Sequence, residues 1–257
     1  MGKAIAIFNQ KGGVGKTTTN VNLSSALAKM GYKVLVIDND PQGNTTSGFG
    51  IDKNSIELGL YEALLGEMDI EKCILSTEEE NLKLMPANLS LAGAEIEMID
   101  INRREERLKF VIDEINHDYD YIFVDCPPSL GLLTINSLVA VDTVIIPIQC
   151  EYYALEGVSS LMSTIELIKK KLNKTLSIEG ILMTMYDGRT NLAVQVVDEV
   201  RTYFKEKVFN TVIPKNVRLA EAPSFGISIF DYDSKSKGAK AYRSLAKEFI
   251  KRNGGAK

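Results

Sequence analysis

The segment at residues 11–18, Lys-Gly-Gly-Val-Gly-Lys-Thr-Thr, constrains the fold of this chain more than any other. It follows an apolar run typical of a buried strand, Ala4–Phe8, and precedes a helical pattern, Thr17–Met30, that Gly31 terminates. Glycines let successive backbone N–H groups turn toward one anion, and the N-terminus of the following helix adds partial positive charge. The segment therefore predicts a phosphate-binding loop between a strand and a helix.

Two side chains complete the predicted loop. Lys16 is expected to reach the terminal phosphates as a point charge, and the Thr17 hydroxyl is expected to be a ligand of the bridging Mg²⁺. The chain is therefore expected to bind a nucleoside triphosphate. The expected nucleotide contacts come from the whole loop: Lys11, Gly12, Gly13, Val14, Gly15, Lys16, Thr17 and Thr18.

The loop departs from the usual spacing G-x-x-x-x-G-K-[ST] at its first position. Gln10 replaces the glycine there, and Lys11 stands beside it. Because one lysine suffices in an ordinary loop, the second can serve a neighbouring active site, as an arginine finger does when a partner chain supplies it. The local chemistry leaves a solvated surface lysine as an equal alternative.

The rest of the chain predicts an α/β fold. A length of 257 residues permits one or two domains, and we expect one over residues 1–257. Strand-like runs alternate with helical patterns, which predicts βαβ units and a three-layer fold: a mostly parallel twisted sheet with helices on both faces. The expected strands are Lys33–Asp38, Leu82–Met85, Tyr121–Val124, Thr143–Ile148, Ile178–Met183 and Val208–Ile213, and the expected later helices are Arg103–Ile115, Leu155–Leu172, Leu192–Lys205 and Ala239–Ile250.

Composition excludes several classes of protein. The net charge of −4 does not indicate nucleic acid, and no apolar run approaches the length of a membrane span, so a cytoplasmic protein is the simplest interpretation. Three cysteines without C-x-x-C spacing argue against a disulfide framework, a zinc site or an iron–sulfur cluster. The single histidine, His117, argues against a histidine-based triad and is expected to be exposed at a helix end.

Acidic residues follow two of the predicted strands. Ligands of a doubly wound sheet bind beyond the carboxyl ends of its strands, so these positions are candidates for the site. Asp125 ends one strand and is expected to hold the magnesium directly or through water. Asp38 is expected to support the same magnesium, and Asp40, two residues later, to orient or deprotonate the attacking water. A turn role before Pro41 is the alternative for Asp40.

Four segments together resemble one family. Residues 11–18, 36–44 (Val-Ile-Asp-Asn-Asp-Pro-Gln-Gly-Asn), 125–131 (Asp-Cys-Pro-Pro-Ser-Leu-Gly) and 213–223 (Ile-Pro-Lys-Asn-Val-Arg-Leu-Ala-Glu-Ala-Pro) look like those of the ParA/Soj chromosome- and plasmid-partition ATPases. The resemblance spans nearly the whole chain. Members are P-loop ATPases with a deviant Walker A motif, and Gln10 with Lys11 matches that deviation.

The resemblance implies roles for particular residues. Lys11 is expected to reach across an ATP-sandwich homodimer to the partner's phosphates, which agrees with the argument from its redundant charge. Asp40 is expected to be essential for hydrolysis. Pro214 and Asn216 lie where family members contact the adenine. The expected catalytic residues are thus Lys11, Lys16 and Asp40.

The resemblance also implies binding to DNA without sequence specificity in the ATP state. From Lys215 to Lys257 the sequence holds ten Lys/Arg and four Asp/Glu, a basic region that can neutralise phosphates. Arg189, Lys215 and Arg218 are the expected DNA contacts, and a solvated arginine is the alternative at the two arginine positions. A ParB/Spo0J-type centromere-binding partner is expected to stimulate hydrolysis, and nucleoid association follows. The short segment before the loop is expected to carry no N-terminal DNA-binding extension.

A membrane-associated division-site regulator like MinD is the main alternative, because it shares the deviant loop. Such a protein needs a C-terminal amphipathic membrane helix. Here no bulky apolar residue follows Ile250, and packing of the last helix onto the domain is the expected arrangement. No membrane contact is therefore expected. A DNA-binding scaffold with negligible turnover is a third possibility, against which Asp40 argues.

Overall fold

The computed structural model describes residues 2–66, 68–151 and 154–255. A seven-stranded sheet runs through it in the order β3-β4-β2-β5-β1-β6-β7, and all neighbours are parallel except β3 with β4. Parallel strands buried on both faces need continuous apolar sequence, which these strands have. Their bounds are β1 Lys3–Ile7, β2 Val34–Asp38, β3 Leu75–Ser76, β4 Leu82–Met85, β5 Tyr121–Asp125, β6 Thr143–Gln149 and β7 Ser177–Thr184.

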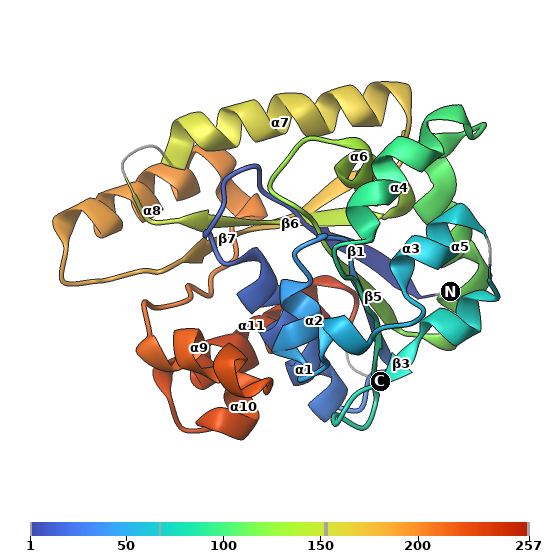
Figure 1. Cartoon of the computed structure of the whole chain (residues 1–257). Coiled ribbons are helices and arrows are strands. Elements are labelled where there is room, and N and C mark those ends of the chain that lie inside the picture. Colours follow the sequence, from blue (N-terminus) through green and yellow to red (C-terminus); the bar gives the residue numbers. More distant parts are fainter. Residues whose placement is uncertain (1, 67, 152–153, 256–257) are drawn as a thin grey trace.

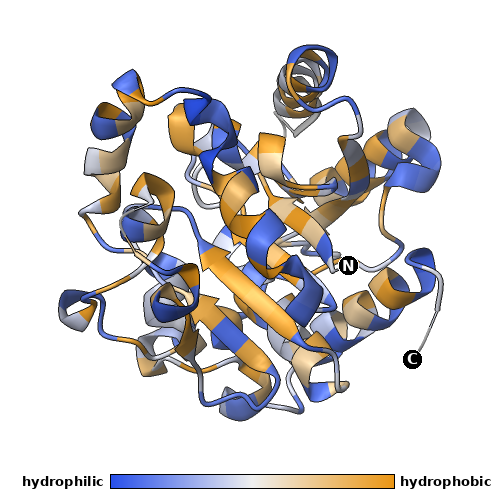
Figure 2. Ribbon diagram, turned by 90° about the vertical axis from the view of Figure 1, so that its right-hand side faces the viewer, coloured by the Kyte–Doolittle hydropathy of each residue, from blue (hydrophilic) through white to orange (hydrophobic). Residues whose placement is uncertain are grey.

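Helices cover both faces of the sheet, as the sequence predicts. In Figure 1, α7 lies above β6 and β7, whereas α1 and α11 lie below the sheet. The strand residues of Figure 2 are largely orange, and the surrounding helices mix orange with blue. The helices are α1 Lys16–Lys29, α2 Asn44–Gly48, α3 Leu60–Leu65, α4 Leu91–Glu97, α5 Arg107–Ile115, α6 Leu132–Ala140, α7 Ala154–Lys171, α8 Asn191–Phe204, α9 Val217–Glu221, α10 Ile229–Tyr232 and α11 Lys237–Arg252.

Alternation along the strands divides the core into two layers. Ile5 and Ile7 of β1 pack with α1 and α11, whereas Ala4 and Ala6 of the same strand pack with the layer formed by α3 to α8. The apolar side of α11 is buried, including Tyr242 at 1% exposure. The expectation that the last helix packs onto the domain is confirmed.

One predicted strand is wrong. Val208–Ile213 lies beside β7 and donates two backbone hydrogen bonds to it, but the two segments share only one isolated bridge, between Ile181 and Val208. The Glu248 carboxylate of α11 accepts the N–H groups of Asn210 and Thr211 at 2.7 and 2.9 Å. Because a side chain takes these donors, the segment does not form a regular ladder with the sheet edge.

A predicted helix also begins later than expected. The pattern predicts a helix from Arg103, but α5 begins at Arg107, after a 3₁₀ turn at Arg104–Glu106. Arg103 itself has a left-handed backbone, with φ of 58°, and this conformation cannot continue a right-handed helix. His117 is exposed in a 3₁₀ turn directly after α5, as expected.

Candidate functional site

The phosphate-binding loop connects β1 to α1 at the carboxyl edge of the sheet. Gly13 and Gly15 have φ values of 75° and 93°, a region that residues with a Cβ rarely adopt. Val14 between them is buried, and its carbonyl accepts a hydrogen bond from the Thr184 hydroxyl at 2.8 Å. The loop is therefore fastened to the end of β7, two strands away from β1.

Lys16 begins α1 and is buried, with 8% of its surface exposed. Its amine donates to the Lys11 carbonyl at 3.1 Å, so the side chain folds back beneath the loop. Burial lowers the pKa of Lys16, and the negative charges of Asp125 and Asp40 oppose this effect. The amine thus lies near both carboxylates, where a phosphate would meet it. Thr18, two residues after Lys16, is half-buried.

Asp38 and Asp125 end neighbouring strands and lie side by side in register. Asp125 accepts hydrogen bonds from the Thr17 and Thr45 hydroxyls at 2.7 and 2.6 Å. Asp38 accepts from the Thr46 hydroxyl at 2.7 Å and from the Thr46 N–H at 2.8 Å. The structure therefore brings the three predicted magnesium ligands, Thr17, Asp38 and Asp125, to one place.

The pKa values of both carboxyl groups, Asp38 and Asp125, are raised. Burial raises the pKa of Asp38, and the charge of Asp125 raises it further. Burial is also the main cause of the raised pKa of Asp125, whose Oδ1 is buried without a hydrogen-bond partner. Carboxylate and hydroxyl oxygens suit Mg²⁺, which typically keeps several waters and takes substrate phosphates as further ligands. Thr17, Asp38 and Asp125 therefore fit such an ion. Because only two of them are carboxylates, they are not a cluster of three or more His, Cys, Asp or Glu, and no such cluster that could hold a metal occurs within the described residues.

Asp40 lies on the loop after β2 and is 8% exposed. Its Oδ1 accepts the N–H of Gln42 at 2.9 Å, and its own N–H donates to Asp38 at 3.3 Å. Asp40 therefore combines the turn role that Pro41 suggested with a place among the acidic groups at the loop edge.

The Lys11 carbonyl accepts the bond from Lys16, but the Lys11 side chain has a different partner. Its amine forms an ion pair with Glu151 of the same chain, and 54% of its side chain is exposed. Its backbone N–H donates to the Asn9 side chain at 2.9 Å. Within one chain, then, the second lysine of the loop is held outward, on the rim of the site.

The expected adenine contacts lie on the same edge of the sheet. The Ile213 N–H donates to Met183 at 2.8 Å, which places the segment beginning at Pro214 beside the end of β7. Asn216 caps α9, because its side-chain oxygen accepts the Arg218 N–H at 2.8 Å. The structure brings Pro214 and Asn216 near the strand that fastens the loop.

The three expected DNA contacts come from two adjacent segments. Lys215 is exposed, and its N–H donates to Tyr186, close to the turn that carries Arg189. Arg189 is 89% exposed and pairs with Asp187 at 2.6 Å. Arg218 pairs with Glu221 at 2.9 Å. Acidic neighbours therefore offset part of the positive charge on this face.

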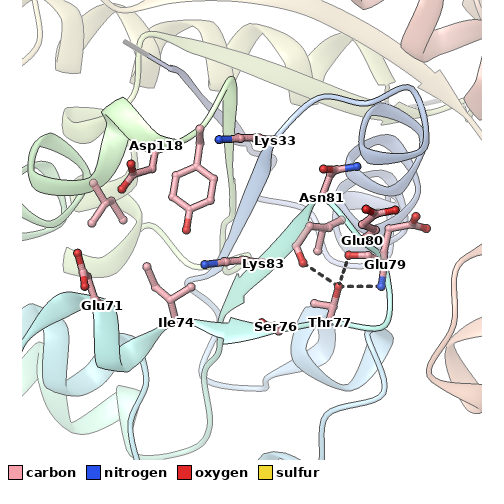
Figure 3. Close-up of a pocket in the computed structure, with 13 residues that line it drawn as sticks. Lys33, Glu71, Ile74, Ser76, Thr77, Glu79, Glu80, Asn81, Lys83 and Asp118 are labelled. Atoms are coloured by element: carbon pink, nitrogen blue, oxygen red, sulfur yellow. Dashed lines mark hydrogen bonds between the residues drawn. The ribbon is translucent and has the colours of Figure 1, made fainter.

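A hollow of about 640 Å³ lies away from the site (Figure 3). Lys33 and Asn81, at the amino ends of β2 and β4, line it, together with Glu71 and Asp118. In a parallel sheet this edge is opposite to the one that carries the loop. The hollow therefore takes no part in the candidate site.

Sequence reasoning missed Thr45, Thr46 and Glu151. The two threonines stand in the first turn of α2, directly after residues 36–44, which hold Asp38 and Asp40. Hydroxyl residues that follow an acidic strand end are a local signal that could have identified them. Glu151 contacts a residue 140 positions earlier, and no local pattern identifies it. The cysteines are free, as predicted.

The whole chain is similar to known proteins. Residues 2–178 match the family model of an AAA domain. The chain is 57% identical to the sporulation initiation inhibitor protein Soj of Bacillus subtilis, over 96% of this chain and 98% of that protein. It is 49% identical to the chromosome-partitioning ATPase Soj of Treponema pallidum, over 99% of each.

A solved structure extends the comparison. Cobyrinic acid a,c-diamide synthase from Mycobacterium smegmatis, with a bound ATP analogue and magnesium, is 37% identical with a TM-score of 0.84, over 96% of this chain and 93% of that one. The relatives that carry the Soj name are more identical, at 48–57%, and match over 96–99% of their own length. This chain belongs to the Soj/ParA family of chromosome-partitioning ATPases.

Proposed function

We propose that residues 1–257 form one ATPase domain that partitions DNA, and that it closes into a homodimer around ATP. The observation that carries the proposal is the meeting of Lys16, Thr17 and the strand-end carboxylates at one edge, with Lys11 held outward beside them. An ordinary phosphate loop explains the first group. A second chain would give the outward lysine a function.

ATP and Mg²⁺ are the proposed ligands, and the Mycobacterium smegmatis structure holds an ATP analogue and magnesium. Lys16 would bind the terminal phosphates, and loop N–H groups would hold the others. Thr17 would hold Mg²⁺, with Asp38 and Asp125 in direct or water-mediated contact. The ion supplies positive charge that offsets the charge developing on the phosphate oxygens. Asp40 would orient the attacking water or accept its proton.

The position of Lys11 supports the proposed dimer. A cation on the rim can reach the phosphates of a facing chain, and each chain would then complete the other's site. ATP would favour the closed pair and hydrolysis would release it, so nucleotide shifts a two-state equilibrium. Pro214 and Asn216 are proposed to contact the adenine.

Binding to double-stranded DNA is proposed for the face formed by Arg189, Lys215 and Arg218. In a dimer two such faces would bind the same DNA together. Binding that depends only on contacts to phosphates would then be stronger than for a single chain. A ParB/Spo0J-type protein is the proposed partner that stimulates hydrolysis. The proposed location is accordingly the nucleoid.

Sedimentation tests this function against the MinD-like alternative. The protein with ATP, ADP or no nucleotide is spun with plasmid DNA and, separately, with anionic vesicles. We expect ATP-dependent sedimentation with DNA only. Sedimentation with vesicles only would favour the membrane-associated regulator. No helix among the described residues is both long and apolar enough to span a bilayer.

A further inference from the structure

The ion pair between Lys11 and Glu151 joins two separate parts of the carboxyl edge. Lys11 belongs to the phosphate loop after β1, and Glu151 follows the neighbouring strand β6, two residues beyond its end. The Glu151 N–H donates to the Gln149 carbonyl at 2.9 Å, which holds the turn. The Glu151 side chain is 32% exposed, so the pair lies on the rim rather than in the core.

We propose that Glu151 is a positioning residue for Lys11, which keeps the amine on its own chain until ATP draws it to a second chain. The inference rests on the proposed function, in which Lys11 acts in trans. One ammonium group on one side chain cannot stay on Glu151 and also reach the phosphates of a facing chain. Formation of the dimer therefore requires this pair to open.

The two possible partners of the amine differ in strength. A partly exposed carboxylate–lysine pair biases an equilibrium by at most about fivefold, because water screens it. A triphosphate carries more charge and accepts several charge-assisted hydrogen bonds. The pair is thus weak enough for nucleotide to open, and while it is formed it lowers the tendency of the chain to dimerise by that same small factor.

The substitution Glu151→Gln tests the proposal, because it removes the charge and keeps the size. Sedimentation velocity with Mg²⁺ and a non-hydrolysable ATP analogue measures the dimer. We expect Glu151→Gln to dimerise about two- to fivefold more tightly than the unaltered chain. Glu166→Gln, which changes an exposed carboxylate of α7, is the matched control and is expected to have no effect. Weaker or unchanged dimerisation of Glu151→Gln would overturn the proposal.

A second readout detects the pair without any dimer. In nucleotide-free protein, acetylation of Lys11 by a water-soluble reagent is followed by mass spectrometry, with exposed Lys33 as the internal reference. Glu151→Gln is expected to raise the Lys11 rate about two- to fivefold, in line with the loss of an exposed pair. Glu151→Asp, which keeps the charge, is expected to restore part of the protection. Equal rates in all three proteins would show that the pair does not exist in solution.

A double substitution separates the two claims. In a Lys11→Ala background, Glu151→Gln is expected to change nothing, because the carboxylate acts through that lysine. If Lys11→Ala dimerises normally, the trans role of Lys11 fails and the proposed function fails with it. If Lys11→Ala loses the dimer while Glu151→Gln behaves like the unaltered chain, only the role of Glu151 is wrong.

Discussion

The Thr17 hydroxyl donates to Asp125 at 2.7 Å, which joins the first turn of α1 to the end of β5. The two residues lie 108 positions apart and were assigned to magnesium from separate motifs. Their contact places the loop and the acidic strand end in one site. A metal ion between them would replace this hydrogen bond.

Replacing Lys16 should weaken nucleotide binding. The amine is buried at the loop, and loss of a hydrogen bond to a charged group costs about 1.5–3 kcal/mol, or roughly 10- to 100-fold in affinity. Isothermal titration of Lys16→Ala with Mg-ATP measures the loss. Lys33→Ala, at the opposite edge, is the control. Equal affinity of the two variants would mean that Lys16 does not bind phosphate.

Replacing Asp40 should separate binding from hydrolysis. We expect Asp40→Ala to bind Mg-ATP normally and to hydrolyse it about 10²- to 10⁴-fold more slowly, because positioned proton transfer contributes that much. Phosphate release with DNA present measures the rate. Asp52→Ala, which removes an exposed cap from a short 3₁₀ turn, is the control. Unaltered turnover in Asp40→Ala would leave Asp40 with the turn role alone.

The nucleotide-free protein should gain stability as the pH falls. Burial and the charge of Asp125 raise the pKa of Asp38 to about 7, and burial raises the pKa of Asp125 to about 6. Because both exceed the ordinary value of 3.8, the folded state holds these protons more tightly than the unfolded state. Their stabilising contribution is complete below the ordinary value and is lost as the pH rises through about 6 to 7.

Thermal unfolding at about pH 5.5 and about pH 8 tests this linkage, and we expect the higher Tm at the lower pH. The double substitution of Asp38→Asn with Asp125→Asn should flatten the difference. A Tm that rises with pH in the unaltered chain, or an unchanged slope in the double variant, would show that these two carboxyls do not control the profile.

The proposed DNA face should lose affinity in a salt-dependent way. Replacing both Arg189 and Arg218 by Ala removes two cations from each chain and thus four from the dimer, and each phosphate contact contributes about 0.9 to the slope of log K against log salt. DNA retention with ATP, measured over a salt series, should therefore show a slope shallower by about 3.6. Arg103→Ala, an exposed arginine remote in sequence, is the control. An unchanged slope would place the DNA elsewhere.

Packing of α11 onto the sheet has an energetic consequence. Phe249 is fully buried, and truncation of a core phenylalanine costs about 3–5 kcal/mol. Urea denaturation of Phe249→Ala should show that loss. Phe225→Ala, at a residue 65% exposed, should change stability little. Near-equal stability of the two variants would mean that α11 is not part of the core.

Much of the fold is predictable from sequence because its signals are local. The continuous apolar runs of β2 and β5 each end at an acidic residue. The glycines of the loop are explained by the positive φ values that a phosphate-binding turn requires. Val208–Ile213 shows where this approach fails. Its apolar pattern matches a strand, but Glu248 from a distant helix takes its backbone donors.

The residues of the site also differ in how far the sequence predicts them. Lys16, Thr17 and Asp125 follow from motifs, because phosphate and magnesium chemistry require those groups in that order. The position of the Lys11 side chain does not follow from any motif, because it depends on an ion pair with Glu151. The order of the strands in the sheet, with β6 next to β1, brings Glu151 close to Lys11.

Complementation between two inactive variants tests the central claim most directly. Lys11→Ala and Asp40→Ala are each assayed for ATP hydrolysis alone and then mixed. In a mixed dimer, the site of the Lys11→Ala chain keeps Asp40 and receives Lys11 from its partner. We predict that mixing restores hydrolysis well above the sum of the separate activities. If Lys11 acts within its own chain, no mixed site is complete, and an activity equal to that sum would contradict the account.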